Sequence, residues 1–397
     1  MTDELLLTCN AGSSSIKLGV HARSATGARR LGRGQVDLRQ KPLTLRITEG
    51  EAIFDLPLGA TATGDLHEVI GAVLGWLAKR FPTGRLAAVG HRVVHGGDRF
   101  AGPERVTDEA LAAIVALTPF APLHQPHSIR LIRAIQRLRP GLPQVASFDT
   151  AFHRTQSDLV RRFALPRAEF DAGIKRYGFH GLSYQSIAAA LARQAPDLAR
   201  GRIVVAHLGS GASLCALEAG VSRDTSMGFS TLDGVPMATR CGALDAGVVL
   251  HLIQQRGLAP DAVEDMLYQR SGLLGVSGIS ADSRTLLASP APEAREALDL
   301  FAFRIAGEVA RLATTLGGLN GIVFTAGIGE HQPAVREAVC RRLAWLGVAL
   351  DPAANAGNAG VVGAAESRVA VLVVPTDEEQ VIADEALSIL HPQEPVA

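Results

Sequence analysis

The stretch Ile203–Leu217, IVVAHLGSGASLCAL, places a short glycine- and serine-rich segment between two runs of mostly apolar, β-prone residues. This pattern predicts a β-hairpin with a polar loop at His207–Ser213. Its two glycines leave backbone N–H groups uncovered, and its two serines add hydroxyl groups. Such a loop can hold the oxygen atoms of a phosphate group, although an ordinary glycine hairpin would have the same pattern.

A similar unit occurs near the start of the chain, where Leu5–Val20 reads LLLTCNAGSSSIKLGV. Aligned without gaps, Asn10–Ser15 corresponds to Leu208–Ser213, 198 residues further along a chain of 397. A unit that recurs at half the chain length indicates a duplicated domain, and ligands favour the cleft between two domains. A third glycine loop is expected in Ile322–Glu330 (IVFTAGIGE), after another apolar strand.

The composition is that of a globular protein long enough for two domains of ordinary size. Its 39 basic and 39 acidic residues cancel, which argues against nucleic acid or a membrane surface as the main partner. The four cysteines form no CxxC pair, so neither a zinc site nor a disulfide framework is indicated. The opening MTDELLLT is unlike a signal peptide, and no run of about 18 apolar residues occurs. A cytoplasmic protein is expected.

Hydrophobic periodicity predicts an α/β chain of two domains. The first would comprise residues 1–149 plus about 379–397, and the second residues 150–378. Strands are expected over residues 5–20 (as a hairpin), 31–58, 86–94, 143–148, 321–326 and 368–374. Helices are expected over residues 66–81, 107–118, 128–138, 184–195, 244–255, 298–317, 335–345 and 378–390. Residues 120–126 are expected to form a rigid loop, and the glycine-rich residues 225–242 a functional loop.

Several common chemistries lack their motifs. No serine has the glycine spacing of a nucleophile elbow, and neither the P-loop nor the dinucleotide-binding glycine pattern occurs. His91 and His95 are spaced as HxxxH, but on a predicted strand-to-loop segment without an intervening glutamate, which argues against zinc.

What remains is a phosphate-binding hairpin with charged groups around it. Arginines in polar or glycine-rich contexts, which we expect to be loops, are suited to carboxylate and phosphoryl oxygens; they are Arg92, Arg240 and Arg284. Oxygen donors suited to Mg²⁺ stand at predicted strand or helix ends; they are Asn10, Asp149 and Glu378. His180 and His207 each adjoin a glycine-rich segment. These are the components of phosphoryl transfer.

The ordered motifs resemble those of the acetate kinase family, within the acetate and propionate kinase group. They are NAGSSSIK at 10–17, HRVVHGG at 91–97, PLHQP at 122–126, FDTAFH at 148–153, YGFHGLS at 177–183, HLGSGAS at 207–213, DTSMGFSTLDG at 224–234, TRCG at 239–242, SGLLGVSG at 271–278, GIGE at 327–330 and PTDEE at 375–379. The resemblance implies a duplicated ribonuclease-H-like fold with a central cleft, as in actin, sugar kinases and Hsp70. It also implies reversible transfer of the ATP γ-phosphoryl group to acetate or propionate, with ATP/ADP as co-substrate, Mg²⁺ (or Mn²⁺) as cofactor, and a homodimer.

The resemblance also assigns roles to individual residues. Asp149, His180 and Arg240 would be catalytic, and Asn10 and Glu378 would be associated with the metal. Arg92 would bind the substrate carboxylate, and Val94, Leu123 and Phe179 would line the acyl pocket. The nucleotide would contact Lys17, His207, Leu208, Gly209, Ser210, Gly211, Asp282, Ser283, Arg284, Gly327, Ile328, Gly329, Glu330 and His331.

The chemistry itself constrains one of these roles. A carboxylate attacks as an anion and needs no general base, whereas two anions that meet need cations to neutralise them. We therefore interpret Asp149 as a group that orients the metal or an arginine, rather than as a base.

The sequence departs from the family pattern at a few positions. Ser210 and His331 stand where asparagine is usual, and Cys241, Ala243 and Ala246 stand where serine, aspartate and proline are usual. Thr231 replaces a typical proline beside the predicted acyl pocket. Because one methylene group in such a pocket changes binding by only about 1–3 kcal/mol, the choice between acetate and propionate stays open.

Three alternatives fit the same fold. One is a kinase with another acceptor, such as butyrate or a sugar; the second is an ATP-dependent conformational binder; the third is a phosphatase of acyl phosphate or polyphosphate. Arg92 favours a carboxylate over a sugar as acceptor, and water as acceptor would leave this arginine without a role. A conformational binder would need a further substrate domain or an extended lid.

Overall fold

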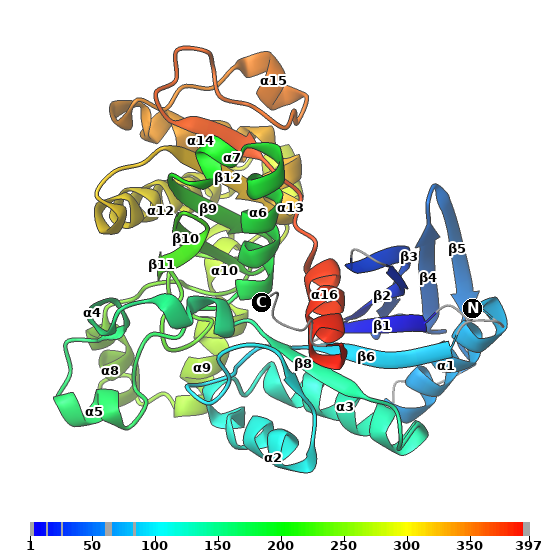
Figure 1. Ribbon diagram of the computed structural model, residues 1–397. Coiled ribbons are helices and arrows are strands. Elements are labelled where there is room, and N and C mark those ends of the chain that lie inside the picture. Colours follow the sequence, from blue (N-terminus) through cyan, green and yellow to red (C-terminus); the bar gives the residue numbers. More distant parts are fainter. Residues whose placement is uncertain (1–3, 13–14, 25–26, 60–65, 82–84, 392–397) are drawn as a thin grey trace. The chain divides into compact units, whose positions relative to one another are not determined.

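The computed structural model of the chain describes residues 4–12, 15–24, 27–59, 66–81 and 85–391. The backbone forms two compact units, one of Met1–Phe152 with Asp377–Ala397 and the other of His153–Thr376. Each unit is built around its own β-sheet (Figure 1). Ser13 and Ser14 of the first predicted phosphate loop lie outside the described residues.

The first unit holds an eight-stranded sheet in the order β5-β4-β3-β2-β1-β6-β8-β7. Its strands are β1 (Glu4–Ala11), β2 (Ser15–Ser24), β3 (Gly27–Asp37), β4 (Thr44–Glu49), β5 (Ala52–Pro57), β6 (Arg85–Val93), β7 (Glu104–Arg105) and β8 (Gln144–Phe148). Strands β1 to β5 pair antiparallel in sequence order, whereas β1, β6 and β8 are parallel. Seven of the eight residues of β1 are buried, as expected for the central strand of a sheet covered on both faces.

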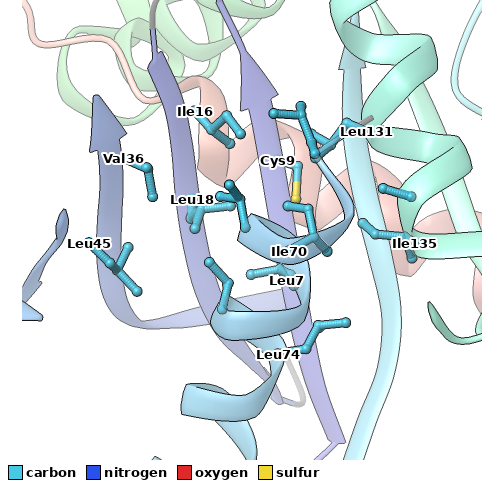
Figure 2. Packing of buried hydrophobic residues seen from close by; sticks show 14 of the residues in the cluster. Leu7, Cys9, Ile16, Leu18, Val36, Leu45, Ile70, Leu74, Leu131 and Ile135 are labelled. Carbon is cyan, nitrogen blue, oxygen red and sulfur yellow. The ribbon is translucent and has the colours of Figure 1, made fainter. Parts of the chain in front are cut away.

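Helices pack on both faces of this sheet. They are α1 (His67–Arg80), α2 (Asp108–Ala116), α3 (Gln125–Leu138) and α16 (Glu378–Leu390). Figure 2 shows Leu7 and Cys9 of β1 in one buried cluster with residues of α1 and α3 such as Ile70 and Ile135. Because side chains alternate along a strand, Thr8 and Asn10 face the opposite side, where α16 packs against the strands.

The second unit holds a five-stranded sheet in the order β11-β10-β9-β12-β13. Its strands are β9 (Arg202–Leu208), β10 (Ala212–Glu218), β11 (Val221–Thr225), β12 (Gly321–Thr325) and β13 (Ala370–Val373). Its helices are α4 (Asp158–Arg161), α5 (Arg167–Asp171), α6 (Gly181–Gln194), α7 (Pro196–Ala199), α8 (Ala246–Gln254), α9 (Pro260–Gln269), α10 (Gly272–Ser277), α11 (Ser283–Ala288), α12 (Pro292–Leu316), α13 (Ala326–His331), α14 (Pro333–Arg342) and α15 (Pro352–Ala356). Helices α12 and α6 pack against this sheet. Within the part of the chain that is described, no helix combines the length and the apolarity needed to cross a bilayer.

The two sheets share one topology, which confirms the duplicated ribonuclease-H-like fold. The order β3-β2-β1-β6-β8 in the first unit repeats as β11-β10-β9-β12-β13 in the second. In both, three antiparallel strands precede two parallel ones. The first unit adds β4, β5 and β7 to this common sheet. Helix α6 follows β8 in the chain but packs on β9, and α16 follows β13 but packs on the first sheet.

The ungapped alignment of the two hairpins is wrong by one residue on the first strand and by two on the second. The last ladder pair before the loop is Ala11–Ile16 in the first unit and Leu208–Ala212 in the second. The first loop is therefore one residue longer than the second. The structural equivalents are the cross-strand pair Asn10–Lys17 in one unit and His207–Ser213 in the other.

Several local predictions also need correction. The segment Ile322–Glu330 is not a loop, because α13 begins at Ala326 directly after β12. The predicted loop at residues 120–126 ends early, because α3 begins at Gln125 with a proline in its first turn, where its missing N–H costs nothing.

Two of the arginines expected in loops lie in regular structure. Arg92 is part of β6, and Arg284 is part of α11. Helix α12 begins at Pro292, six residues before the predicted start, again with a proline in the first turn.

Replacement of Ile382 by alanine is expected to destabilise the first unit by about 2–5 kcal/mol, because the cavity it leaves cannot be filled by neighbouring backbone. Ile382 of α16 is fully buried, and its Cγ2 lies where a Cβ on Gly90 of β6 would approach to 2.6 Å. Urea unfolding would measure the effect. Ser388→Ala, on an exposed position of α16, is the control and should change stability by less than about 0.5 kcal/mol. Equal stability of the two variants would contradict this packing.

Candidate active site

The first unit contains a buried ion pair at the ends of β6 and β8. Arg92 donates from Nε to Oδ1 of Asp149 at 3.0 Å and from Nη2 to Oδ2 at 2.6 Å. The side chain of Asp149 is 1% exposed and that of Arg92 is 16% exposed. A two-pronged contact of this kind fixes the plane of the guanidinium group as well as its position.

Two further polar side chains extend this pair. Nη1 of Arg92 donates to Oδ1 of Asn10 at 3.1 Å, and Nδ2 of Asn10 donates to Oε2 of Glu378 at 2.8 Å. Burial alone would disfavour the charged guanidinium, but the carboxylates of Asp149 and Glu378 outweigh it and raise the pKa of Arg92 above its ordinary value. The four residues, from β1, β6, the end of β8 and the start of α16, thus form one network around a permanent cation.

Lys17 lies beside this network. It is the cross-strand partner of Asn10, so both side chains project from the same face of the sheet. Burial and the charge of Glu378 raise the pKa of Glu379, and Lys17 acts in the opposite direction on that carboxyl group. Lys17, Asn10 and Glu378, to which the sequence assigned separate nucleotide and metal roles, therefore lie on one polar surface of the first unit.

The residues predicted to line the acyl pocket belong to different units. In the first unit Val94 is buried and Leu123 is 36% exposed, whereas Phe179 is buried in the second unit. Their common role stays a prediction. Among the described ranges, no group of three or more His, Cys, Asp or Glu side chains is arranged to hold a metal ion.

In the second unit, three nitrogen-bearing side chains surround the hairpin between β9 and β10. A Cβ atom placed on Gly211 would lie 3.5 Å from Nε2 of His180 and 3.5 Å from Nη2 of Arg240. A Cβ atom placed on Gly209 would lie 3.7 Å from Nε2 of His207. Side chains at these two glycines would therefore lie against these three nitrogen atoms.

A pocket of about 530 Å³ adjoins the same hairpin. It is lined by Gly209, Ser210, Ala238, Ala281, Asp282, Ser283, Arg284, Gly327, Ile328, His331 and Gln332. The structure thus brings three segments that lie far apart in the sequence, and that were each predicted to contact the nucleotide, around one cavity. Its volume is within the range of small-molecule sites.

Two acidic residues of these segments have structural partners. Asp282 caps α11 by accepting from the backbone N–H of Arg284, and its contact with the Arg284 side chain lowers its pKa. Glu330 accepts from the backbone N–H of Ala326 at 2.8 Å and of Thr376 at 3.3 Å. Both carboxylates therefore hold the pocket walls in place.

Sequence reasoning missed Arg336, which is completely buried. Its nitrogens donate to side-chain oxygens of Asn355 and Asn358 and to backbone carbonyls that include Gly329 and Glu330. Burial lowers the pKa of Arg336 below its ordinary value. This guanidinium holds the end of α13, part of the pocket wall, in one position. An arginine in an amphipathic helix gives no sign of this in the sequence.

His153, the last residue of the motif at 148–153, was also given no role. Its Nε2 contacts the carbonyl oxygen of Phe179 at 3.0 Å, and its Nδ1 contacts Oγ of Ser222 at 2.9 Å. Since a carbonyl only accepts, Nε2 carries the proton. His153 therefore holds the backbone that leads into His180, whose φ of 59° is unusual for a residue with a side chain.

The chain is similar to known proteins over nearly its whole length. The sequence profile of the Acetokinase family matches residues 5–384. The acetate kinase of Rhodopseudomonas palustris is 48% identical over 388 residues, covering 96% of this chain and 97% of that protein. The acetate kinase of Methylocella silvestris is 44% identical over 394 residues, covering 97% of this chain and 98% of that protein.

Two solved structures are also similar. A propionate kinase from Francisella tularensis superposes with a TM-score of 0.88 at 31% identity, covering 96% of this chain and 98% of that one. The acetate kinase of Porphyromonas gingivalis superposes with a TM-score of 0.84 at 34% identity, covering 98% of this chain and all of that one.

The buried state of His153 makes stability depend on pH. Burial lowers its pKa from 6.5 to about 4, so the unfolded chain takes up a proton between these values that the folded chain excludes. The free energy of unfolding should therefore fall by about 1.4 kcal/mol per pH unit for this residue as the pH drops from 6.5 to 4. His153→Gln should flatten that slope in urea unfolding curves. His251→Gln, at an exposed histidine, is the matched control; equal slopes in both variants would refute the assignment.

Proposed function

The chain belongs to the acetokinase family, and from that premise we propose that it transfers the γ-phosphoryl group of ATP reversibly to acetate, giving acetyl phosphate and ADP. The observation that carries the proposal is Arg92, a permanently charged group held in one plane by Asp149 and Asn10. Guanidinium has five N–H groups, so Nη1 and Nη2 each keep a second N–H beyond these contacts. Those two can take the carboxylate of the acceptor.

On the phosphoryl side, we assign ATP to the 530 Å³ pocket of the second unit, with its phosphates at the Gly209–Gly211 hairpin. His180 and Arg240 would stabilise the phosphoryl group in flight, since both present nitrogens to that hairpin. A direct in-line transfer needs no covalent enzyme intermediate, because the acceptor carboxylate is itself the nucleophile.

Asp149 acts in this proposal as a positioning group. Both of its carboxylate oxygens accept from Arg92, and the attacking carboxylate has no proton to give up. A general base is therefore unnecessary, and the role left for Asp149 is to hold the guanidinium in the plane that receives the substrate.

The side chains of Asn10 and Glu378, which the sequence associated with the metal, have the donor atoms that Mg²⁺ prefers. Glu378 offers a carboxylate and Asn10 an amide oxygen, both hard donors, at the edge of the Arg92 network. An ion that arrives with a nucleotide keeps most of its ligands as phosphate and water, so one carboxylate is sufficient. Bound there, Mg²⁺ or Mn²⁺ would neutralise phosphate charge, while Asn10 and Glu378 orient it.

The proposal extends to the acceptor range and the assembly. Acetate is the expected acceptor, and propionate is the alternative. Thr231, which stands where proline is typical, is buried beside Arg240, and Nη1 of Arg240 donates to the carbonyl oxygen of Thr231 at 2.9 Å. A homodimer would cover the apolar residues of α8, of which Val248 and Leu250 are 41% and 53% exposed. Cytoplasmic location stays an expectation from the sequence.

Arg92→Ala is expected to lower kcat/KM for acyl-phosphate formation at least about 100-fold, because it removes the cation that holds the acceptor. Hydroxylamine trapping with ATP and Mg²⁺ across formate, acetate, propionate and butyrate would measure it. The control is Arg46→Ala, which removes an exposed arginine paired with Asp55. Turnover of ATP by the wild-type protein without trapped product would reject the carboxylate-kinase function and favour a phosphatase or a conformational ATPase.

Asp149→Asn is expected to lose activity because Arg92 is no longer held in its plane, and because Asn10 and Glu378, the proposed metal residues linked to Arg92 by hydrogen bonds, shift with it. Part of the loss should return on raising the Mg²⁺ concentration or replacing it by Mn²⁺, and the shape of the pH–rate profile should stay that of the wild type. A variant rescued only by higher pH, with no response to the metal, would instead identify Asp149 as a proton acceptor.

A further inference from the structure

The start of α6 and the β9–β10 pair are joined by two reciprocal hydrogen bonds. Nδ1 of His180, at the start of the helix, contacts Oγ of Ser213 on β10 at 2.8 Å. Nδ1 of His207, on β9, contacts Oγ of Ser183 in the helix at 2.8 Å. His207 and Ser213 are direct cross-strand partners, so both face the helix. Each histidine is therefore held through Nδ1 by a serine of the opposite element.

This arrangement aligns the two imidazoles. Their centroids are 4.2 Å apart and their planes differ by 15°. Since both Nδ1 atoms are engaged by serines, both Nε2 atoms point toward the glycine hairpin, where they lie 3.5 Å and 3.7 Å from Cβ positions on Gly211 and Gly209. Nε2 of His180 and Nε2 of His207 therefore both lie next to the hairpin, on two nearly parallel rings.

Tyr184 sets the direction of one of these bonds. Its hydroxyl also contacts Oγ of Ser213, and Tyr184, Ser183 and Ser213 are all completely buried. A phenol is a better donor and a poorer acceptor than an aliphatic hydroxyl. Tyr184 therefore donates to Ser213, and the single proton of Ser213 is committed to Nδ1 of His180.

We propose that Ser213 with Tyr184, and Ser183, are positioning residues that keep His180 and His207 as neutral rings protonated at Nε2. Both rings then present N–H donors, rather than lone pairs, to phosphoryl oxygens at the hairpin. The proposal deepens the function proposed above and rests on it for the identity of the phosphoryl group.

The charges around the pair agree with neutral rings. Two imidazolium ions stacked at this distance would repel each other, and Arg240 already supplies a cation to the same hairpin. The ring of His153 packs edge-on against Tyr184, with the ring centroids 5.7 Å apart, and burial lowers the pKa of His153 to about 4. In this arrangement the fixed charge comes from arginine, and the histidines contribute oriented dipoles.

The test combines a tautomer measurement with kinetics on the full-length protein. In ¹⁵N-histidine-labelled protein, two-dimensional NMR distinguishes Nε2–H from Nδ1–H rings without substrate, and His180→Asn and His207→Asn assign the signals. We expect Nε2–H for both rings in the wild type. Ser213→Ala should release His180 into mixed tautomers and leave His207 unchanged, while Ser183→Ala should do the reverse.

In the trapping assay, Ser213→Ala should lower kcat about 10- to 100-fold and Tyr184→Phe by less, with KM for ATP changed under threefold. Tyr268→Phe and Ser388→Ala are the matched controls. A wild-type His180 protonated at Nδ1, or tautomers and kcat unaffected by Ser213→Ala, would overturn the proposal. If no acyl phosphate forms, the proposed function fails and the tautomer pattern alone decides the positioning roles.

Discussion

The buried ion pair between Arg92 and Asp149 is the contact on which the polar site of the first unit depends. Removing two charges from water costs several kcal/mol per ion, and the cost is offset only when the remaining donors and acceptors are satisfied. Asn10 of β1 accepts one further N–H of Arg92, and Glu378 of α16 accepts in turn from Asn10. The last helix, α16, therefore has to pack on the first sheet, and the chain places it there after β13. This order of elements is what brings Glu378 to Asn10.

The duplication gives each unit the same position for polar side chains but different chemistry. The cross-strand pair next to the hairpin loop is Asn10–Lys17 in one unit and His207–Ser213 in the other. Each pair faces the first turn of a helix, α16 in one case and α6 in the other. The first unit fills this position with an amide and a lysine ammonium group, which suit a carboxylate acceptor. The second fills it with hydroxyls and imidazoles, which suit the many oxygens of a phosphate chain.

Much of this was predictable from sequence, for identifiable reasons. The hairpins, the central strands and α16 have strong local patterns, so their existence and approximate limits followed from periodicity. The segment after β12 was not predicted to be helical, because the glycines at 327 and 329 have low helix propensity. In the structure, packing of α13 against β9 and β12 overrides this low propensity. Arg336 and His153 were missed because their role depends on burial, which no single residue in a sequence reveals.

The departures from the family pattern can now be located. Ser210 and His331 both line the 530 Å³ pocket of the second unit, whereas none of the four residues of the Arg92 network departs from it. A shorter hydroxyl at 210 and an imidazole at 331 change the hydrogen-bonding groups of the pocket that we assign to the nucleotide, and they leave unchanged the cation that we assign to the acceptor. Divergence of this chain from its relatives should therefore be sought in nucleotide affinity and base preference, where the pocket differs, before it is sought in recognition of the carboxylate.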